Sequence, residues 1–400
     1  METRCRHDYR DYETSPTGPS DADNPAAIHP GLCKLTNEVH PIFRRNNFPG
    51  VEYEVLVPVL RLASLLIDTD CLLDFWHAIF FGERCKLHPE GDGIDDDTTY
   101  VNFSRRRAQL SARDRAMTRL KLGTLSHMVK FYADPSQEAD SAEAWCQDER
   151  KLDGCPYDLG NVEGVVDRIM YSEKSYLDLQ RLSTEEHPDQ DALEWKWLFM
   201  AVLLTHELAH GAGFMAFGPD AETIFEGGTI GEIGYEWTDH IFGGLLWPGD
   251  ASLVEPGSCV VANWPSASIA KLYTHRDYSI WLRGQCPDID VSWPVSRTFC
   301  RKLFDPTFWE DEVPKFGADA LKPTKGIAYR CKVDQTGDFT HFRPRPESAD
   351  FFDGVPDGYY ASESGFSPWL HPIASWTDAD QEGWGRLMRI NVDALYLNGE

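Results

Sequence analysis

The segment from Trp197 to Phe214, WLFMAVLLTHELAHGAGF, constrains the fold more than any other part of the chain. Every residue between Trp197 and Leu204 is apolar, so a helix formed here is apolar on every side. Such a helix belongs in the centre of a domain, because each of its faces must be covered by other parts of the protein. We therefore predict a central buried helix across ALEWKWLFMAVLLTHELAHG.

Local signals predict where this helix begins and ends. Asp189 or Asp191 is available as its N-cap, and Gly211 and Gly213 stand where a helix would stop. The glycine-rich stretch that follows, GAGFMAFGPDAETIFEGGTIG, is predicted to be a loop. Beyond it, EIGYEWTDHIFGG is typical of a shorter helix that ends at two glycines.

Two histidines and a glutamate close the apolar run. His206 and His210 are four residues apart, which puts both side chains on one helix face with Cβ atoms roughly 5–6 Å apart. Two imidazole nitrogens at this spacing can bind one zinc ion, which takes nitrogen ligands at about 2.0–2.1 Å. Glu207 lies about 100° around the helix from His206, beside the predicted ion rather than on its ligand line. That placement suits a general base.

Composition bounds the class of protein. The chain has 400 residues, a hydrophobic share of 42% and a net charge of -27. The acidity argues against nucleic acid or an anionic membrane surface as partner. No secretory signal and no apolar run of about 18–20 residues is found, so we expect an intracellular protein. The ten cysteines form no CxxC pair, which argues against a cysteine zinc ribbon.

The polarity of the chain divides it into three parts. Residues 1–34 are polar and are predicted to form a disordered tail. Residues 35–323, which contain the HELAH motif, are predicted to form a catalytic domain. Residues 324–400 are predicted to form an irregular extension, for which we can infer no function. Within the domain, EVLVPVLRLASLLIDTDCLLDFWHAIFFG predicts two helices that meet near Asp68 to Asp70. VVDRIMYS is typical of a strand, and so is GIAYRCKV in the last part.

The HELAH motif at the end of an apolar helix resembles the zincin metallopeptidases. The resemblance covers about residues 167–244, and it implies an edge strand before the motif helix and a second helix with the third ligand. HELAHG followed by EIGYEWTDHIFGG also resembles fungal metallopeptidase-like proteins that carry HExxH and a Glu-x-Gly-aromatic…Phe-Gly-Gly block. This resemblance supplies a class of enzyme and not a substrate. The fold that we expect is α+β and zincin-like, mostly helical with a small mixed sheet.

Three zincin layouts differ in the third ligand. The metzincin layout fails because Ala216 stands where it needs a histidine. The aspzincin layout matches only in part, since GTIGEIGYE carries a glutamate one position late. The gluzincin layout takes a glutamate from a downstream helix, which fits this chain best. The acidic residues available after His210 are Asp220, Glu222, Glu226, Glu232, Glu236 and Asp239.

Glu232 is the favoured third ligand, and Glu236 is the alternative. The two are four residues apart on the predicted second helix, so they share a face. If Glu232 binds the metal, Glu236 is placed to accept a hydrogen bond from a ligand histidine. The alternatives for an oxyanion donor stay open among Tyr235, His240, Tyr273 and His275.

These observations predict a zinc-dependent hydrolase with one zinc ion per chain. A peptide or protein is the expected substrate, and Glu207 is expected to take a proton from the attacking water. One alternative is a protein without activity whose zinc holds two helices together, with Asp239 or His240 as the fourth ligand. Another is a zinc hydrolase of non-peptide amides or esters. The sequence does not indicate an oligomeric state.

Overall fold

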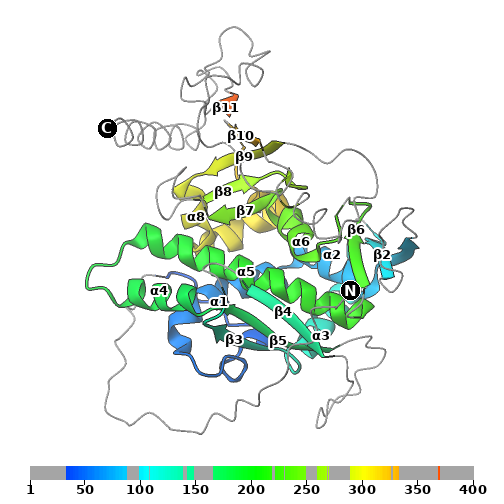
Figure 1. Cartoon of the computed structure of the whole chain (residues 1–400), viewed down its shortest axis with the longest axis horizontal. Coiled ribbons are helices and arrows are strands. Elements are labelled where there is room, and N and C mark those ends of the chain that lie inside the picture. The colour runs from blue at the N-terminus through cyan, green and yellow to red at the C-terminus, as the bar shows by residue number, and fades with distance from the viewer. Residues whose placement is uncertain are drawn as a thin grey trace.

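The computed structural model has an α+β architecture. It describes residues 33–87, 99–107, 109–137, 142–147, 165–218, 221–228, 230–248, 259–267, 269, 289–325, 328–332 and 368–369. The predicted N-terminal tail lies almost wholly outside these residues, and so does most of the predicted C-terminal extension. Helices form the body of the protein and three small sheets lie against it, where we expected a single small mixed sheet (Figure 1).

Most of the buried hydrophobic residues in the described ranges lie in α-helices. These helices are α1 (Tyr53–Asp68), α2 (Leu73–Phe81), α3 (Ala112–Leu125), α4 (Glu173–Thr184), α5 (Gln190–Phe217), α6 (Ile233–Phe242), α8 (Arg297–Leu303) and α9 (Val313–Phe316). Short 3-10 turns η1 (Pro41–Phe43), η2 (Arg45–Asn47), η3 (Asp70–Leu72) and η5 (Gly317–Leu321) and the π-helical turn η4 (Phe308–Glu312) connect or extend them. The predicted pair of helices that meet near Asp68 to Asp70 is confirmed by α1, η3 and α2.

The first two sheets have three strands each. In the order β1-β2-β6, β1 (Glu83–Leu87) is antiparallel to β2 (Thr99–Ser104), and β2 is parallel to β6 (Ala221–Phe225). In the order β3-β5-β4, β3 (Lys130–Asp134) is parallel to β5 (Val165–Ser172), whereas β4 (Ala142–Gln147) is antiparallel to it. The predicted strand VVDRIMYS is confirmed as β5. Both sheets mix parallel and antiparallel pairs.

The third sheet has five antiparallel strands in the order β11-β10-β9-β8-β7. They are β7 (Leu245–Pro248), β8 (Cys259–Ala262), β9 (Ile289–Val295), β10 (Ala328–Lys332) and β11 (Pro368–Trp369). The predicted strand GIAYRCKV is confirmed by β10. Because β10 pairs with β9, the segment that we assigned to a C-terminal extension begins as part of this sheet.

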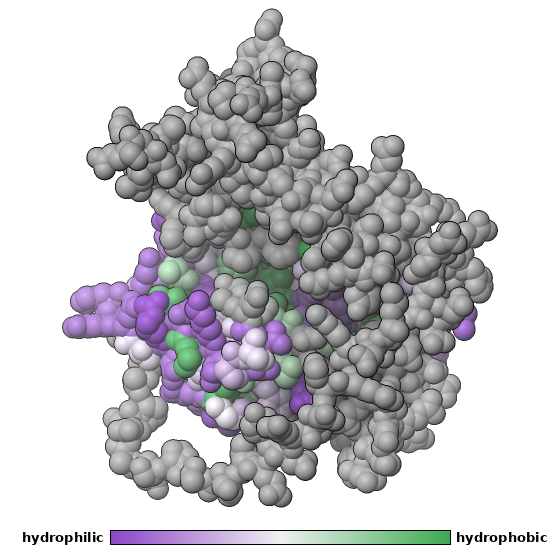
Figure 2. All heavy atoms as spheres, in the orientation of Figure 1, coloured by the Kyte–Doolittle hydropathy of each residue, from purple (hydrophilic) through white to green (hydrophobic). Residues whose placement is uncertain are grey.

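The motif helix α5 runs through the middle of the protein, between the β3-β5-β4 sheet and the sheet of β7 to β11 (Figure 1). Its apolar residues are buried, including Trp197, Leu198, Ala201, Leu204 and Leu208. The helix is long and apolar enough to cross a membrane, but 72% of its apolar window is buried inside the protein. It is a core helix, as predicted. In the same orientation, described residues at the outside are mostly hydrophilic and hydrophobic ones lie deeper (Figure 2).

The ends of α5 are set by caps, one of which the sequence did not indicate. Asp189 is the N-cap, and its carboxylate accepts hydrogen bonds from the backbone N–H groups of Asp191 and Ala192. The prediction that the helix stops at Gly211 and Gly213 is wrong. The helix continues to Phe217 and ends at Gly218, whose φ of 93° is open to glycine at no steric cost.

The predicted loop after the motif is also wrong in part. Its first residues continue α5, and residues 221–225 form β6 in parallel register with β2. The shorter helix is confirmed as α6, which ends at Gly243 in the left-handed conformation with φ 67°. Therefore β6 and α6 follow the motif helix and fold back beside it.

Candidate metal centre

The two histidines of HELAH project from the same face of one helix. His206 and His210 lie one turn apart on α5 with ring centroids 5.2 Å apart. Their side chains are 12% and 26% exposed, so both rings are mostly covered but still reach solvent. The buried neighbours of α5 hold the helix in one rotation about its axis, and this fixes the direction in which both rings point.

Glu232 meets the two histidines from the start of α6. It is the N-cap of this helix, and one of its carboxylate oxygens accepts the backbone N–H of Tyr235 at 2.5 Å. The other oxygen lies 2.5 Å from Nε2 of His210 and 3.6 Å from Nε2 of His206. The donor atoms of the three residues all lie within 4.8 Å of one another, which no other group of metal-binding side chains in the described ranges achieves.

This donor set fits a zinc ion. Two imidazole nitrogens and one carboxylate oxygen match the ligands of catalytic zinc sites. Ligand atoms about 2.0–2.1 Å from a tetrahedral ion lie roughly 3.3 Å apart, close to the separation of His206 and Glu232. The contact of Glu232 with His210 is shorter, at 2.5 Å. The carboxylate of Glu232 is buried and needs a positive partner, which a metal would supply.

The electrostatics of Glu232 agree with a cation between these groups. Burial raises the pKa of the Glu232 carboxyl, but the charges and hydrogen bonds of His210 and His206 outweigh burial and hold the pKa well below its usual value. The carboxylate is therefore the favoured form beside a positive charge. Its fixed geometry and favoured ionisation are those that a pre-organised metal ligand needs.

Glu207 lies beside the donor set and is not part of it. Its Oε1 is 3.8 Å from Nε2 of His206, and the residue is 5% exposed. Burial is the largest influence on Glu207 and raises the pKa of its carboxyl, and the charge of Glu232 raises it further. The charges of His206 and His210 and a hydrogen bond from the backbone N–H of Ala144 lower this pKa, but the net shift is upward. A buried carboxyl with a raised pKa next to a metal position suits proton transfer. Ala144 brings strand β4 into the site.

A glycine that sequence reasoning passed over lets α6 approach His206. A Cβ atom on Gly234 would lie 2.5 Å from Cδ2 and Nε2 of His206, too close for any side chain. Tyr235, the next residue, packs its ring edge-to-face on His206 with centroids 4.7 Å apart. The E-x-G-aromatic pattern carried this signal, since a glycine directly before an aromatic residue can mark a close approach of the backbone to a neighbouring group. Together these contacts orient the His206 ring.

Glu236 points away from the histidines. Both of its carboxylate oxygens accept the backbone N–H of Phe225 in β6, at 2.9 and 2.8 Å. The expectation that Glu232 and Glu236 share a helix face does not hold, because Glu232 is the N-cap, with non-helical φ and ψ of -147° and 87°, and α6 begins at the next residue. A Cβ on Gly228 would lie 2.8 Å from Oε1 of Glu236, so this glycine makes room for the buried carboxyl.

Two of the four candidates for an oxyanion donor, Tyr235 and His240, lie within the described residues but in different places. The ring of Tyr235 contacts His206 at the site, and burial raises the pKa of its hydroxyl above the usual value. His240 lies on the side of α6 that faces α2, where its Nε2 is 3.0 Å from Oδ1 of Asp74. Only Tyr235 is brought to the metal position. Tyr273 and His275 lie outside the described residues.

The remaining acidic candidates for the third ligand lie away from the two histidines or outside the described residues. Glu226 forms a two-pronged ion pair with Arg105 of the segment after β2. Asp239 is not a member of the metal-binding group. Asp220 and the side chain of Glu222 lie outside the described residues.

Comparisons of the chain with protein-family models, with curated proteins and with solved structures found no match. Any function assigned to the chain therefore rests on the chemistry of its own residues.

Proposed function

We propose that the chain is a zinc-dependent hydrolase of the zincin type, a metallopeptidase that holds one zinc ion with His206, His210 and Glu232. The observation that carries the proposal is the convergence of these three donor groups within 4.8 Å, with Glu207 beside them and outside the donor set. Three protein ligands are typical of catalytic zinc, whereas structural sites use four.

Zinc bound by these residues would supply a Lewis acid that polarises a carbonyl group and increases the acidity of water. Glu207 is placed to accept the proton of the attacking water on Oε1, the oxygen nearest His206. Its raised pKa favours holding that proton until it passes to the leaving amine. Tyr235 and Gly234 hold the His206 ring, so that the reacting groups keep one geometry.

Strand β4 supports a peptide as substrate. It is the last strand in the order β3-β5-β4, and the N–H of Ala144 is directed to Glu207. One edge of β4 therefore faces the site with no strand paired to it in the described part of the chain. An extended peptide can add to such an edge through main-chain hydrogen bonds. This would place a peptide bond next to the general base.

The first test is the metal content of purified protein, measured by elemental mass spectrometry after loosely bound ions are removed. We expect about one zinc per chain in the wild type and a loss of zinc in His210→Ala, because one direct ligand is missing. Protein that takes up no zinc on reconstitution at neutral pH contradicts the proposal. Peptide cleavage by the zinc-loaded chain is then screened with a peptide library.

The second test separates the role of Glu207 from metal binding. Glu207→Gln keeps the shape of the side chain and removes the base, so we expect normal zinc content and a loss of turnover of about 10²–10⁴-fold. Retained turnover would mean that another group takes the proton. Amide and ester probes measured beside the peptides show whether the hydrolase prefers a non-peptide substrate.

The alternative is a closed structural zinc site, which can be tested on the same purified protein. It needs a fourth protein ligand, and the sequence offered Asp239 or His240 for that role. His240 is paired with Asp74 instead. An open site releases zinc to a small chelator and binds a hydroxamate, whereas a closed site resists both.

A further inference from the structure

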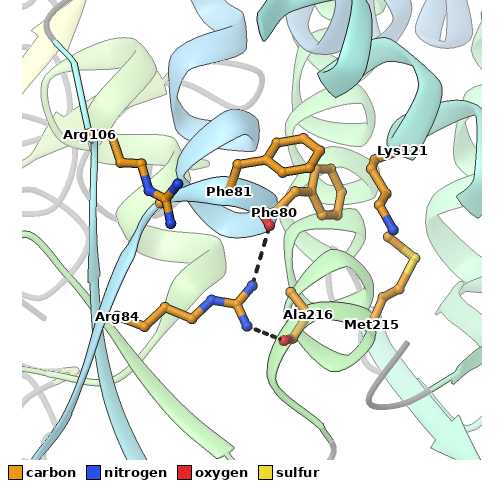
Figure 3. A pocket seen from close by; sticks show the side chains of 8 residues that line it. Phe80, Phe81, Arg84, Arg106, Lys121, Met215 and Ala216 are labelled. Carbon is orange, nitrogen blue, oxygen red and sulfur yellow. Dashed lines mark hydrogen bonds between the residues drawn. The ribbon is translucent and has the colours of Figure 1, made fainter. Parts of the chain in front are cut away.

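A second concave site lies at the C-terminal end of the motif helix. It has a volume of about 720 Å³, within the range of small-molecule sites. Figure 3 shows the aromatic rings of Phe80 and Phe81 from α2 along it, with Met215 and Ala216 of α5 on one side. These residues give the pocket an apolar part.

Three cationic side chains complete the lining, and one of them has a structural role. Arg84 donates hydrogen bonds to the carbonyl oxygens of Ala216 at 2.8 Å and Ile79 at 3.1 Å. Its guanidinium also lies 4.5 Å from the ring centre of Phe217. Arg84 thereby joins the C-terminal ends of α2 and α5, where the helix dipoles favour a positive charge.

The other two cations are available to a ligand. Arg106, in the turn after β2, and Lys121, on α3, both line the pocket (Figure 3). Neither forms a hydrogen bond or an ion pair with any residue that the structure describes. This is notable in a chain with a net charge of -27, where acidic partners outnumber basic ones. Two cations without a partner among the described residues, beside an apolar surface, fit an anion with an apolar body.

The pocket is separate from the metal centre. Met215 follows His206 by nine residues, which places it about 180° around the helix axis, and it is about 140° from His210. The pocket therefore lies across α5 from the metal ligands. A ligand bound there is not the peptide held at Glu207.

We propose that this pocket binds a small amphiphilic anion, whose phosphate or carboxylate pairs with Arg106 or with Lys121 on opposite sides of the pocket (Figure 3) and whose apolar or aromatic body lies against Phe80, Phe81 and Met215. Phenyl phosphate is the matched probe, because it combines both parts. Inorganic phosphate lacks the apolar body, and benzylamine has the ring with the opposite charge.

The experiment is calorimetric titration of the full chain with the three probes. We expect saturable binding of phenyl phosphate, at least tenfold weaker binding of inorganic phosphate, and no binding of benzylamine. The double variant Arg106→Gln, Lys121→Gln is expected to weaken phenyl phosphate binding at least tenfold. Arg113→Gln is the matched control, because Arg113 is an exposed cation of α3 that does not line the pocket, and it is expected to leave binding unchanged.

Two further variants test where the ligand binds. Ala216→Leu fills part of the pocket and is expected to weaken binding, with circular dichroism as the check of folding. His206→Ala is expected to leave binding unchanged, since His206 lies on the other face of α5. The proposal is overturned if phenyl phosphate does not saturate at about 10 mM, if benzylamine binds equally well, if Arg113→Gln matches the double variant, or if His206→Ala abolishes binding.

Discussion

One carboxylate oxygen of Glu232 lies 2.5 Å from Nε2 of His210, while the other accepts the first-turn backbone N–H of α6. The same side chain therefore starts a helix and offers a ligand atom. Because the cap holds the carboxylate, the position of the third donor is tied to the position of α6 against α5. A ligand held in this way loses little freedom when it binds a metal.

Variants of Glu232 and Glu236 can be compared to test which of the two residues is the third zinc ligand. Glu232→Gln should weaken zinc binding more than about 100-fold, since loss of a direct ligand exceeds the 10–100-fold cost of an outer partner. Glu236→Gln should leave zinc affinity nearly unchanged, because burial raises the pKa of Glu236 well above its usual value and a neutral amide replaces it. Zinc affinity is measured by competition with a chromophoric chelator. The reverse order of effects would make Glu236 the ligand.

Gly234 permits the contact between α6 and His206. In Gly234→Ala the added Cβ would lie 2.5 Å from the His206 ring, so the ring or the helix must move. We expect zinc affinity to fall about 10–100-fold, the usual cost of disturbing a ligand's orientation. The same chelator competition measures it.

Gly123 in α3 is the control for adding a methyl group to a helical glycine. A Cβ there meets no atom within 4 Å. Gly123→Ala should therefore keep zinc affinity and raise the free energy of unfolding by about 0.5–1 kcal/mol. Equal zinc affinity in both alanine variants would show that the close approach at Gly234 does not orient His206.

The central helix and the position of its two histidines on one face are predictable from local sequence. The apolar run and the four-residue spacing depend only on helix geometry, and α5 conforms to both. The error at Gly211 and Gly213 has a tertiary cause. Gly213 packs against Ile233, where a Cβ would come within 3.3 Å, so the glycine serves the contact of α5 with α6 rather than a helix end.

The surroundings of the motif depend on contacts that local patterns do not contain. Strand β6 is only five residues long and pairs in parallel with β2, which is distant in sequence. The resemblance to gluzincins points to Glu232, but the geometry of Glu232 as an N-cap appears only in the fold. The partner of His240, Asp74, comes from α2 and could not be predicted from spacing along α6.

Asp189 is the cap that the structure selects from the two that the sequence offered. Asp189→Ala removes the acceptor for two N–H groups of the first turn of α5, so we expect a loss of about 0.5–2 kcal/mol in the free energy of unfolding. Asp189→Ser retains an acceptor and should recover most of this loss. Urea denaturation measures both. Equal stability of the two variants would mean that the cap contributes nothing to the core helix.

Asp74 joins α2 to α6 and to the turn that follows β2. Its Oδ1 lies 3.0 Å from Nε2 of His240, and its Oδ2 accepts a hydrogen bond from Arg105 at 3.1 Å. Burial raises the pKa of Asp74, but the hydrogen bonds and charges of His240 and Arg105 outweigh it and leave the pKa below the ordinary 3.8. A depressed pKa in the folded state means that the ionised carboxylate stabilises the fold.

The sign of this linkage gives a pH-dependent test. The stabilisation from Asp74 is fully present above pH 3.8, the ordinary value, and is lost as the pH falls through the lower pKa of the folded state. Asp74→Asn should therefore cost about 1–3 kcal/mol at pH 7, and the difference from wild type should shrink below pH 3.8. Urea denaturation from pH 7 to pH 3 measures it. Asp319→Asn is the control, because Asp319 is fully exposed and its pair with Lys322 is screened by water. A cost for Asp74→Asn that stays constant over this range would show that the carboxylate acts through packing and not through its charge.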